Sequence, residues 1–122
     1  MEENNLENRV NVTHIIAEFR GCNETLLDKS DVVKQILEDA VKKSELTKIR
    51  SHFHQFSPFG VTGFILLKES HISIHTWPEF NYAAIDVFGC GDRSKVLHAY
   101  NLLAEHFKPS EIKKKEIKRG LD

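Results

Sequence analysis

The sequence predicts an α+β fold, a two-layer sandwich in which a mostly antiparallel sheet carries two helices on one face. Apolar residues recur with helical spacing in only two segments, 28–44 and 92–107. Much of the remaining chain is rich in β-branched and aromatic residues, and four of the resulting strands follow one another through short connections, which favours antiparallel pairing. The expected order is one strand, a helix, four strands, a helix and a last strand. Two helices can cover one face of such a sheet.

Length and composition favour a single domain, residues 1–122. Hydrophobic residues make up 40% of the chain and include eight phenylalanines, which is enough for a packed core. The formal net charge of −1 argues against a nucleic-acid partner bound through phosphate neutralisation. The first residues lack the basic and apolar regions of a signal peptide, and no apolar run is long enough to span a bilayer. We therefore expect a cytoplasmic protein with no membrane partner, whose Cys22 and Cys90 are free thiols.

The first part of the chain is expected to contain a frayed start, a strand and a helix. Residues 1–8 are polar and give no sign of packing. The run VNVTHIIAEF, which begins at Val10, is rich in β-branched residues and predicts a strand. In segment 28–44 the apolar residues share one helical face, and Ser30 or Asp28 can serve as the N-cap.

Four strands are expected in the middle of the chain, separated by turns. Residues 46–56 alternate, so that His52, His54 and Phe56 share one face of their strand. A turn at residues 57–60 follows. The other three strands are predicted at residues 61–67, 72–77 and 82–88, connected through residues 68–71 and 78–81.

The last part of the chain is expected to hold the second helix and a basic tail. Residues 89–92 should break the sheet, and Asp92 can cap a helix that ends at Phe107, because Pro109 prevents its continuation. The tail, residues 111–119, is predicted to be either a basic edge strand or a frayed end. Its lysines are better explained as a solvated edge than as a phosphate-binding site.

The stretch 64–92, FILLKESHISIHTWPEFNYAAIDVFGCGD, is chemically unusual. It combines apolar runs with side chains that serve in acid–base and nucleophilic chemistry. These side chains are Ser70, His71, Ser73, His75, Thr76, Glu79 and Cys90. The packing of ordinary strands does not require such a set, so its density predicts a functional site.

The sequence ESHISIHTWPE, followed by YAAIDVFGCGD, resembles the signature of the short prokaryotic S-adenosylmethionine decarboxylases. The similarity runs from Ile49 to Asp92, with a weaker match in HIIAEFRGC near the start. Members of this family are proenzymes that cut themselves to form a pyruvoyl group. The resemblance implies a decarboxylase of S-adenosylmethionine that supplies the aminopropyl donor of spermidine and other polyamines, with a pyruvoyl group made from Ser70 as cofactor. It also implies a homodimer with sites at or near the subunit interface, which would cover the sheet face that the helices leave open.

Self-cleavage would divide the chain between Glu69 and Ser70, into residues 1–69 and 70–122. The Ser70 hydroxyl lies one peptide away from the Glu69 carbonyl and can attack it if the bond is held strained. The resemblance assigns to His75 the removal of the Ser70 α-proton. On a straight strand Ser70 and His75 point to opposite faces, so we expect the chain to bend at Ser70.

Two further residues are implied by the resemblance to act in processing or decarboxylation. Cys90 matches the family's proton donor, between two glycines that let the substrate approach; a buried structural cysteine is the alternative. Thr62 stands where the family usually has a serine that assists either step, and threonine keeps the hydroxyl but is stiffer at χ1. Asn81 and Gly89 replace the commoner glycine and threonine. Asparagine tolerates positive φ in a turn, whereas Gly89 bears on substrate fit.

Substrate binding is implied at three residues. Phe56 and Trp77 match the aromatic residues that contact adenine in the family, and Glu79 matches the acid that holds the ribose hydroxyls. The positive sulfonium would also favour aromatic faces and a nearby carboxylate. Packing in the core is the alternative for both aromatic residues. Decarboxylation of ornithine, arginine or another amino acid stays open, and so does a non-cleaving binding module or dimer partner.

Seven histidines raise the question of a metal site. His52 and His54 share a strand face, and His71, His75 or Cys90 would have to supply further ligands. This spacing matches no closed zinc pattern, so we expect no metal.

Overall fold

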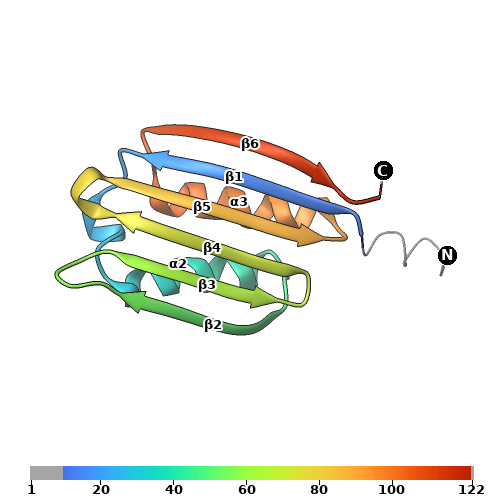
Figure 1. The fold of residues 1–122 in the computed structure, drawn as a ribbon, viewed down its shortest axis with the longest axis horizontal. Coiled ribbons are helices and arrows are strands. Elements are labelled where there is room, and N and C mark those ends of the chain that lie inside the picture. Colours follow the sequence, from blue (N-terminus) through green and yellow to red (C-terminus); the bar gives the residue numbers. More distant parts are fainter. Residues whose placement is uncertain (1–9, 122) are drawn as a thin grey trace.

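A computed structural model of the chain describes residues 10–121 and has the expected architecture (Figure 1). Six strands form one sheet in the order β2-β3-β4-β5-β1-β6, and every neighbouring pair is antiparallel. The polar segment 1–8, expected to be frayed, lies outside the described residues. The elements are β1 (Val12–Arg20), η1 (Glu24–Leu26), α2 (Ser30–Lys43), β2 (Lys48–Gln55), β3 (Val61–Leu67), β4 (Ser70–Trp77), η2 (Pro78–Phe80), β5 (Tyr82–Cys90), α3 (Arg93–Phe107) and β6 (Glu111–Arg119).

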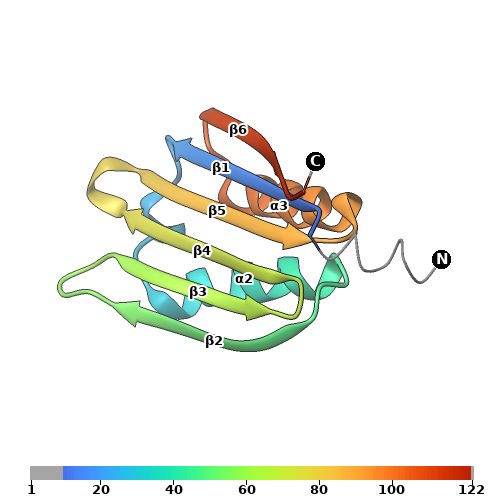
Figure 2. The ribbon, with the colours of Figure 1, turned by 45° about the vertical axis from the view of Figure 1, so that its right-hand side comes forward.

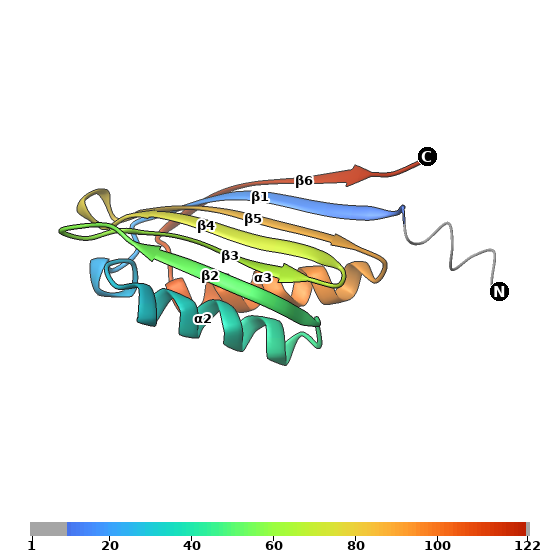
Figure 3. The same cartoon turned by 60° about the horizontal axis from the view of Figure 1, so that its bottom comes forward.

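Helices α2 and α3 lie on the same face of the sheet (Figures 2 and 3). Every second residue of the central strands points toward the helices and is buried, as Ile15 and Ile74 are. These side chains form one hydrophobic core with the apolar stripes of the helices, which include Leu37 and Leu103. The prediction of a two-layer α+β sandwich with both helices on one face is therefore confirmed.

The sheet extends farther than expected around the Glu69–Ser70 bond. β4 begins at Ser70 and β5 continues to Cys90. The expected break of the sheet at residues 89–92 is therefore wrong for residues 89 and 90, which belong to β5. Gly89 pairs with Ser70, and a Cβ at Gly89 would lie 2.6 Å from Cγ2 of Val96 in α3. Gly89 is thus a strand residue packed against a helix, although its sequence surroundings suggest a loop.

The C-terminal tail forms an edge strand, which was one of two expected alternatives. β6 pairs with β1 along its whole length. On the helix side, Arg93 donates to the Glu116 carboxylate through Nε at 2.7 Å and through Nη2 at 3.0 Å, and Lys114 lies 5.0 Å from the centre of the Tyr100 ring. These contacts with α3 come from residues distant in the sequence, so the tail's own pattern could not decide between the two alternatives.

One of the two expected helix caps is present. Asp92 accepts a hydrogen bond of 2.9 Å from the first turn of α3, as predicted. Helix α2 follows Lys29, which makes no side-chain cap, so the prediction of Ser30 or Asp28 as N-cap is wrong. The side-chain oxygen of Gln55 accepts from the Ser30 amide at 2.6 Å instead. The Ser30 amide at the start of α2 is therefore capped by β2, and the next turn amide, that of Val32, donates to the Asp31 carboxylate at 2.9 Å.

Both cysteines are free thiols, as expected. Cys22 is buried, and burial raises the pKa of its thiol to about 11, so it stays protonated at neutral pH. Cys90 is half-buried at the end of β5. Within residues 10–121, no helix combines the length and the apolar character needed to cross a membrane.

Candidate active site

The sheet face turned away from the helices, here called the open face, carries most of the predicted functional side chains. It bears five of the seven histidines, among polar side chains. It also exposes Ile16, Phe64 and Leu66, each about two-fifths accessible to solvent. Large apolar side chains exposed on an uncovered sheet face indicate a binding surface. The histidines are His14, His52, His54, His71 and His75.

A cavity of about 270 Å³ at one end of this face brings together five of the predicted residues. Its lining includes Phe56, Thr62, His75, Trp77 and Glu79. Thr62 lies directly opposite His75 in the β3–β4 register, and its Oγ1 is 3.1 Å from Nδ1 of the imidazole. A hydroxyl in hydrogen-bond contact with an imidazole is suited to proton transfer.

The aromatic residues of this cavity are accessible rather than packed in the core. Phe56 is 48% exposed and Trp77 is 40% exposed, so the alternative that they are core residues is wrong. One face of Trp77 stacks on Tyr82, with ring centres 5.3 Å apart and planes 29° apart. Phe59, from the loop between β2 and β3, lines the same cavity. We call Phe56, Phe59 and Trp77 the aromatic slot, because their flat faces suit a planar ligand.

The Glu69–Ser70 bond lies at the opposite end of β4. The Glu69 carbonyl accepts a hydrogen bond of 2.9 Å from the backbone amide of Cys90. Ser70 has φ +154°, a value that non-glycine residues rarely adopt and that costs about 1–3 kcal/mol. The Glu69 carboxylate accepts from the Thr47 amide at 3.0 Å and from the Thr47 hydroxyl at 3.3 Å. We call Glu69, Ser70 and Cys90 the cleavage end.

The cleavage end and the Thr62–His75 pair do not meet within one chain. β4 stays paired with β5 from Ser70 to Trp77, so it is a regular strand. His75 lies five positions after Ser70, which at about 3.3 Å per residue amounts to roughly 16 Å. The expected bend at Ser70 is therefore wrong as a means of joining the two residues, because the unusual φ affects one residue and the ladder continues beyond it.

A cluster of His14, His71, Asp86 and Phe88 lies between these two groups. His71 stacks on Phe88 with ring centres 5.3 Å apart, and His14 meets the same ring edge-on at 5.0 Å. Nε2 of His14 is 3.6 Å from the Asp86 carboxylate. Burial lowers the pKa of His71, and His14 lowers it further, although Asp86 acts in the opposite direction. The middle of the open face thus carries a neutral imidazole at neutral pH.

Several residues near the site were missed by the sequence analysis. Phe59 was assigned to a turn, and His14 and Asp86 were not singled out. Gln55 was also missed, although its amide nitrogen donates to the backbone oxygens on both sides of the slot's loop, those of Phe56 and Gly60, at 3.1 and 3.0 Å. The alternation of side chains along β1 and β5 could have indicated His14 and Asp86, because it places both on the open face once the strand order is known.

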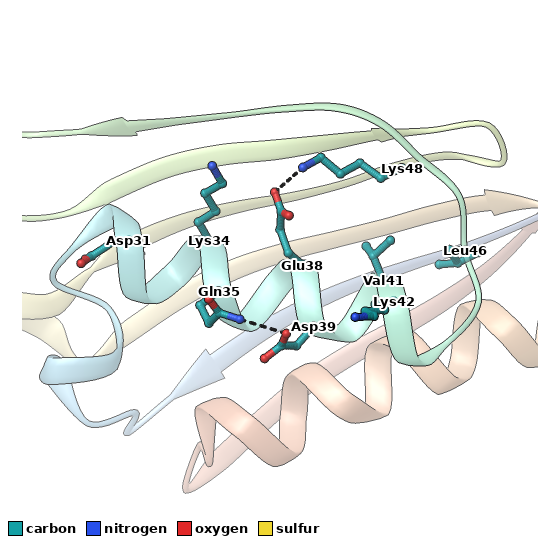
Figure 4. A pocket seen from close by; sticks show the side chains of 9 residues that line it. All are labelled: Asp31, Lys34, Gln35, Glu38, Asp39, Val41, Lys42, Leu46 and Lys48. Atoms are coloured by element: carbon teal, nitrogen blue, oxygen red, sulfur yellow. Dashed lines mark hydrogen bonds and ion pairs between the residues drawn. The ribbon is translucent and has the colours of Figure 1, made fainter.

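A larger groove of about 610 Å³ lies away from the open face, beside α2 and the start of β2 (Figure 4). Its side chains carry charges of both signs, and Glu38 accepts from Lys48 at 2.7 Å. It contains none of the predicted functional residues, so we interpret it as a solvated helix surface. Among residues 10–121, no three histidine, cysteine or acidic side chains are grouped closely enough to bind a metal ion.

Comparison with known proteins agrees with this geometry. Residues 13–120 match the family model described as S-adenosylmethionine decarboxylase. The chain is 51% identical to the S-adenosylmethionine decarboxylase proenzyme of Hydrogenobaculum sp., over 88% of this chain and 81% of that protein, and 50% identical to the Archaeoglobus fulgidus proenzyme, over 88% and 96%. The crystal structure of the adenosylmethionine decarboxylase from Aquifex aeolicus superposes with a TM-score of 0.89 at 42% identity, covering 93% of each chain. The chain belongs to the S-adenosylmethionine decarboxylase family.

Proposed function

We propose that this chain is a self-processing decarboxylase of S-adenosylmethionine, which supplies the aminopropyl donor of spermidine and other polyamines. Its cofactor is a pyruvoyl group made from Ser70. The observation that carries the proposal is the cleavage end: a serine with φ +154° follows a carbonyl that already accepts a hydrogen bond from Cys90. Family membership and the aromatic slot support the choice of substrate.

Self-cleavage begins when Oγ of Ser70 attacks the Glu69 carbonyl carbon. The C–N bond breaks, the hydroxyl proton passes to the released amine, and the amide becomes an ester. The Cys90 amide points at the oxygen on which negative charge develops, the arrangement of an oxyanion hole. A base then removes the Ser70 α-proton, and the Cβ–Oγ bond breaks with Glu69 leaving as a carboxylate. The resulting dehydroalanine tautomerises to an imine, which takes up water and loses ammonia.

The base for the second step comes from a second copy of the chain. His75 is roughly 16 Å from Ser70 in its own chain, at about 3.3 Å per residue along β4. Two open faces packed about a two-fold axis that passes near the middle of β4 would place the cleavage end of each chain against the Thr62–His75 pair of the other, because such an axis exchanges the two ends of the strand. The exposed Ile16, Phe64 and Leu66 would then be covered. We therefore propose a homodimer with two composite sites.

In decarboxylation the pyruvoyl carbonyl supplies the electron sink. The half-buried Cys90 holds the proton that returns to the substrate's Cα. Phe56 and Trp77 take the adenine between aromatic faces, and Glu79 accepts from the ribose hydroxyls. Within the described residues 10–121, no lysine or arginine lines the cavity of the slot, which suits a sulfonium cation.

A basic amino acid is the second candidate substrate, because Glu79 could also face a distal cation. The three aromatic residues of the slot count against it, since ornithine and arginine have no ring to stack. A non-cleaving binding module would have no use for a serine with unusual φ next to a hydrogen-bonded carbonyl.

Intact-mass measurement tests the proposal directly. Purified wild-type protein should give two chains, residues 1–69 and a 70–122 chain with a blocked N-terminus, whereas Ser70→Ala should stay intact. The processed protein should release carbon dioxide from carboxyl-labelled S-adenosylmethionine in preference to labelled ornithine or arginine. Wild-type protein that keeps its full mass after prolonged warming would refute the pyruvoyl enzyme. Preference for a basic amino acid would refute only the substrate.

A further inference from the structure

We infer that Thr47 and the Glu69 carboxylate form a clamp that positions the Glu69–Ser70 peptide for self-cleavage. The inference rests on the proposed function and assigns a role to a residue outside the family signature quoted above. Thr47 is a positioning residue in this account, because it acts through Glu69 and does not touch the reacting atoms.

The clamp consists of three hydrogen bonds between Thr47 and two consecutive residues of the β3–β4 turn. The Lys68 amide donates to the Thr47 carbonyl at 2.9 Å. The Thr47 amide donates to Oε1 of Glu69 at 3.0 Å, and the Thr47 hydroxyl donates to Oε2 at 3.3 Å. Both oxygens of one carboxylate are thus engaged by a single residue, and a charged acceptor makes such bonds stronger than neutral ones.

A fourth hydrogen bond holds Glu69 from the other side. The Cys90 amide donates to the Glu69 carbonyl at 2.9 Å, so the side chain and the carbonyl of the same residue are fixed by two different parts of the fold. Thr47 lies between α2 and β2, whereas Cys90 ends β5. Because Glu69 cannot turn freely, the strained φ of Ser70 cannot relax by rotation of the preceding residue.

Self-cleavage requires this restraint more than folding does. The attack succeeds only when Oγ of Ser70 lies close to the Glu69 carbonyl carbon, and a misplacement of about 1 Å can slow such a reaction by about a hundredfold. The β3–β4 hairpin itself is secured by the strand ladder from Thr62 to Leu66. Loss of the clamp should therefore reduce the cleavage rate while the fold persists.

The test follows the cleavage of freshly synthesised chains by intact-mass spectrometry. Glu69→Leu removes both side-chain hydrogen bonds and should slow cleavage at least tenfold; Thr47→Val removes the hydroxyl bond alone and should slow it by about threefold, a loss typical of one hydrogen bond. Thr47→Ser restores the hydroxyl and should cleave at nearly the wild-type rate. Thr25→Val is the matched control, because it removes a threonine hydroxyl that donates to Asn23 at 2.9 Å in η1.

The outcomes separate the clamp from the proposed function. Failure of the wild-type chain to cut would refute the proposed function. If the wild-type chain cuts and both Glu69→Leu and Thr47→Val cut at the wild-type rate, the clamp is refuted. Thermal unfolding of each variant, measured before it is cut, reports any general loss of structure. If Thr25→Val and Thr47→Val lower the melting temperature equally and slow cleavage equally, the effect is structural and the inference is wrong. Thr47→Val and Thr47→Ser give an answer even if Glu69→Leu does not fold.

Discussion

At the scale of single residues, the open face separates two tasks that the sequence places side by side. Trp77 lies only seven positions after Ser70, yet one lines the aromatic slot and the other starts the strand at the far end. The slot also includes Phe59, which comes from a different hairpin. Its position is fixed through the next residue, since the Gly60 carbonyl accepts from the backbone amide of Phe56 and from the side-chain amide of Gln55.

Replacing Phe59 with alanine should therefore weaken substrate binding. Base–aromatic stacking contributes about 1–3 kcal/mol, so we expect KM for S-adenosylmethionine to rise by about tenfold with little change in kcat. Because Trp77 is the chain's one tryptophan, its fluorescence can also report binding of the unreactive ligand 5′-methylthioadenosine.

Phe80→Ala is the matched control for this substitution. Phe80 is 72% exposed at the same end of the sheet but does not line the cavity. Equal effects of Phe59→Ala and Phe80→Ala on both measurements would contradict the assignment of Phe59 to the slot.

At the scale of secondary-structure elements, local patterns predicted every helix and strand except the short η1 and η2 and the edge strand β6, which was one of two alternatives for the tail. They failed where a distant element decides the outcome. The cap on the Ser30 amide of α2 comes from Gln55, the tail is held by Arg93, and Gly89 continues β5 because it pairs with Thr13 of β1 and Ser70 of β4. Asn81 is the opposite case: its positive φ of 55° was predictable from the tolerance of asparagine for turns.

The contact of Gly89 with α3 predicts a cost for restoring the threonine that is commoner in the family. A Cβ at this position would lie 2.6 Å from Val96 Cγ2, so Gly89→Thr should lower the free energy of unfolding by about 1–3 kcal/mol through overpacking. Chemical denaturation in a Ser70→Ala background, where the chain stays intact, measures this change.

Val96→Ala provides the second arm of a double-mutant cycle. If the clash is the cause, the double variant should lose less stability than the sum of the two single variants, because the smaller side chain admits the threonine. Strict additivity would show that the two positions do not interact and that Gly89 is explained by something other than Val96.

At the scale of the whole molecule, the sequence singled out candidate site residues, whereas only the family resemblance implied that two chains build the site. The parity of β4 showed that Ser70 and His75 point to opposite faces, and the structure adds that a regular ladder keeps them far apart. A site shared between chains accounts for the separation along β4, and no pattern within one sequence encodes it directly.

Complementation distinguishes a shared site from one built within a single chain. Ser70→Ala and His75→Ala should each stay uncut when produced alone. When they are produced together, a mixed dimer contains one site with an intact Ser70 and an intact His75 from different chains, so the His75→Ala chain should be cut. Absence of cutting in dimers shown by sedimentation and mass to contain both chains would contradict the shared site.

The strand order also determines what would become of the two products of the proposed cleavage. Residues 1–69 supply β1, β2 and β3, whereas residues 70–122 supply β4, β5 and β6. Along the sheet, β2-β3 of the first product is followed by β4-β5 of the second, then by β1 of the first and β6 of the second. The two products are therefore interleaved at three seams, with β1 enclosed between strands of the other product. Dilution alone would not separate them, because separation would require dismantling the sheet. The cut would thus convert one polypeptide into a permanently intertwined pair.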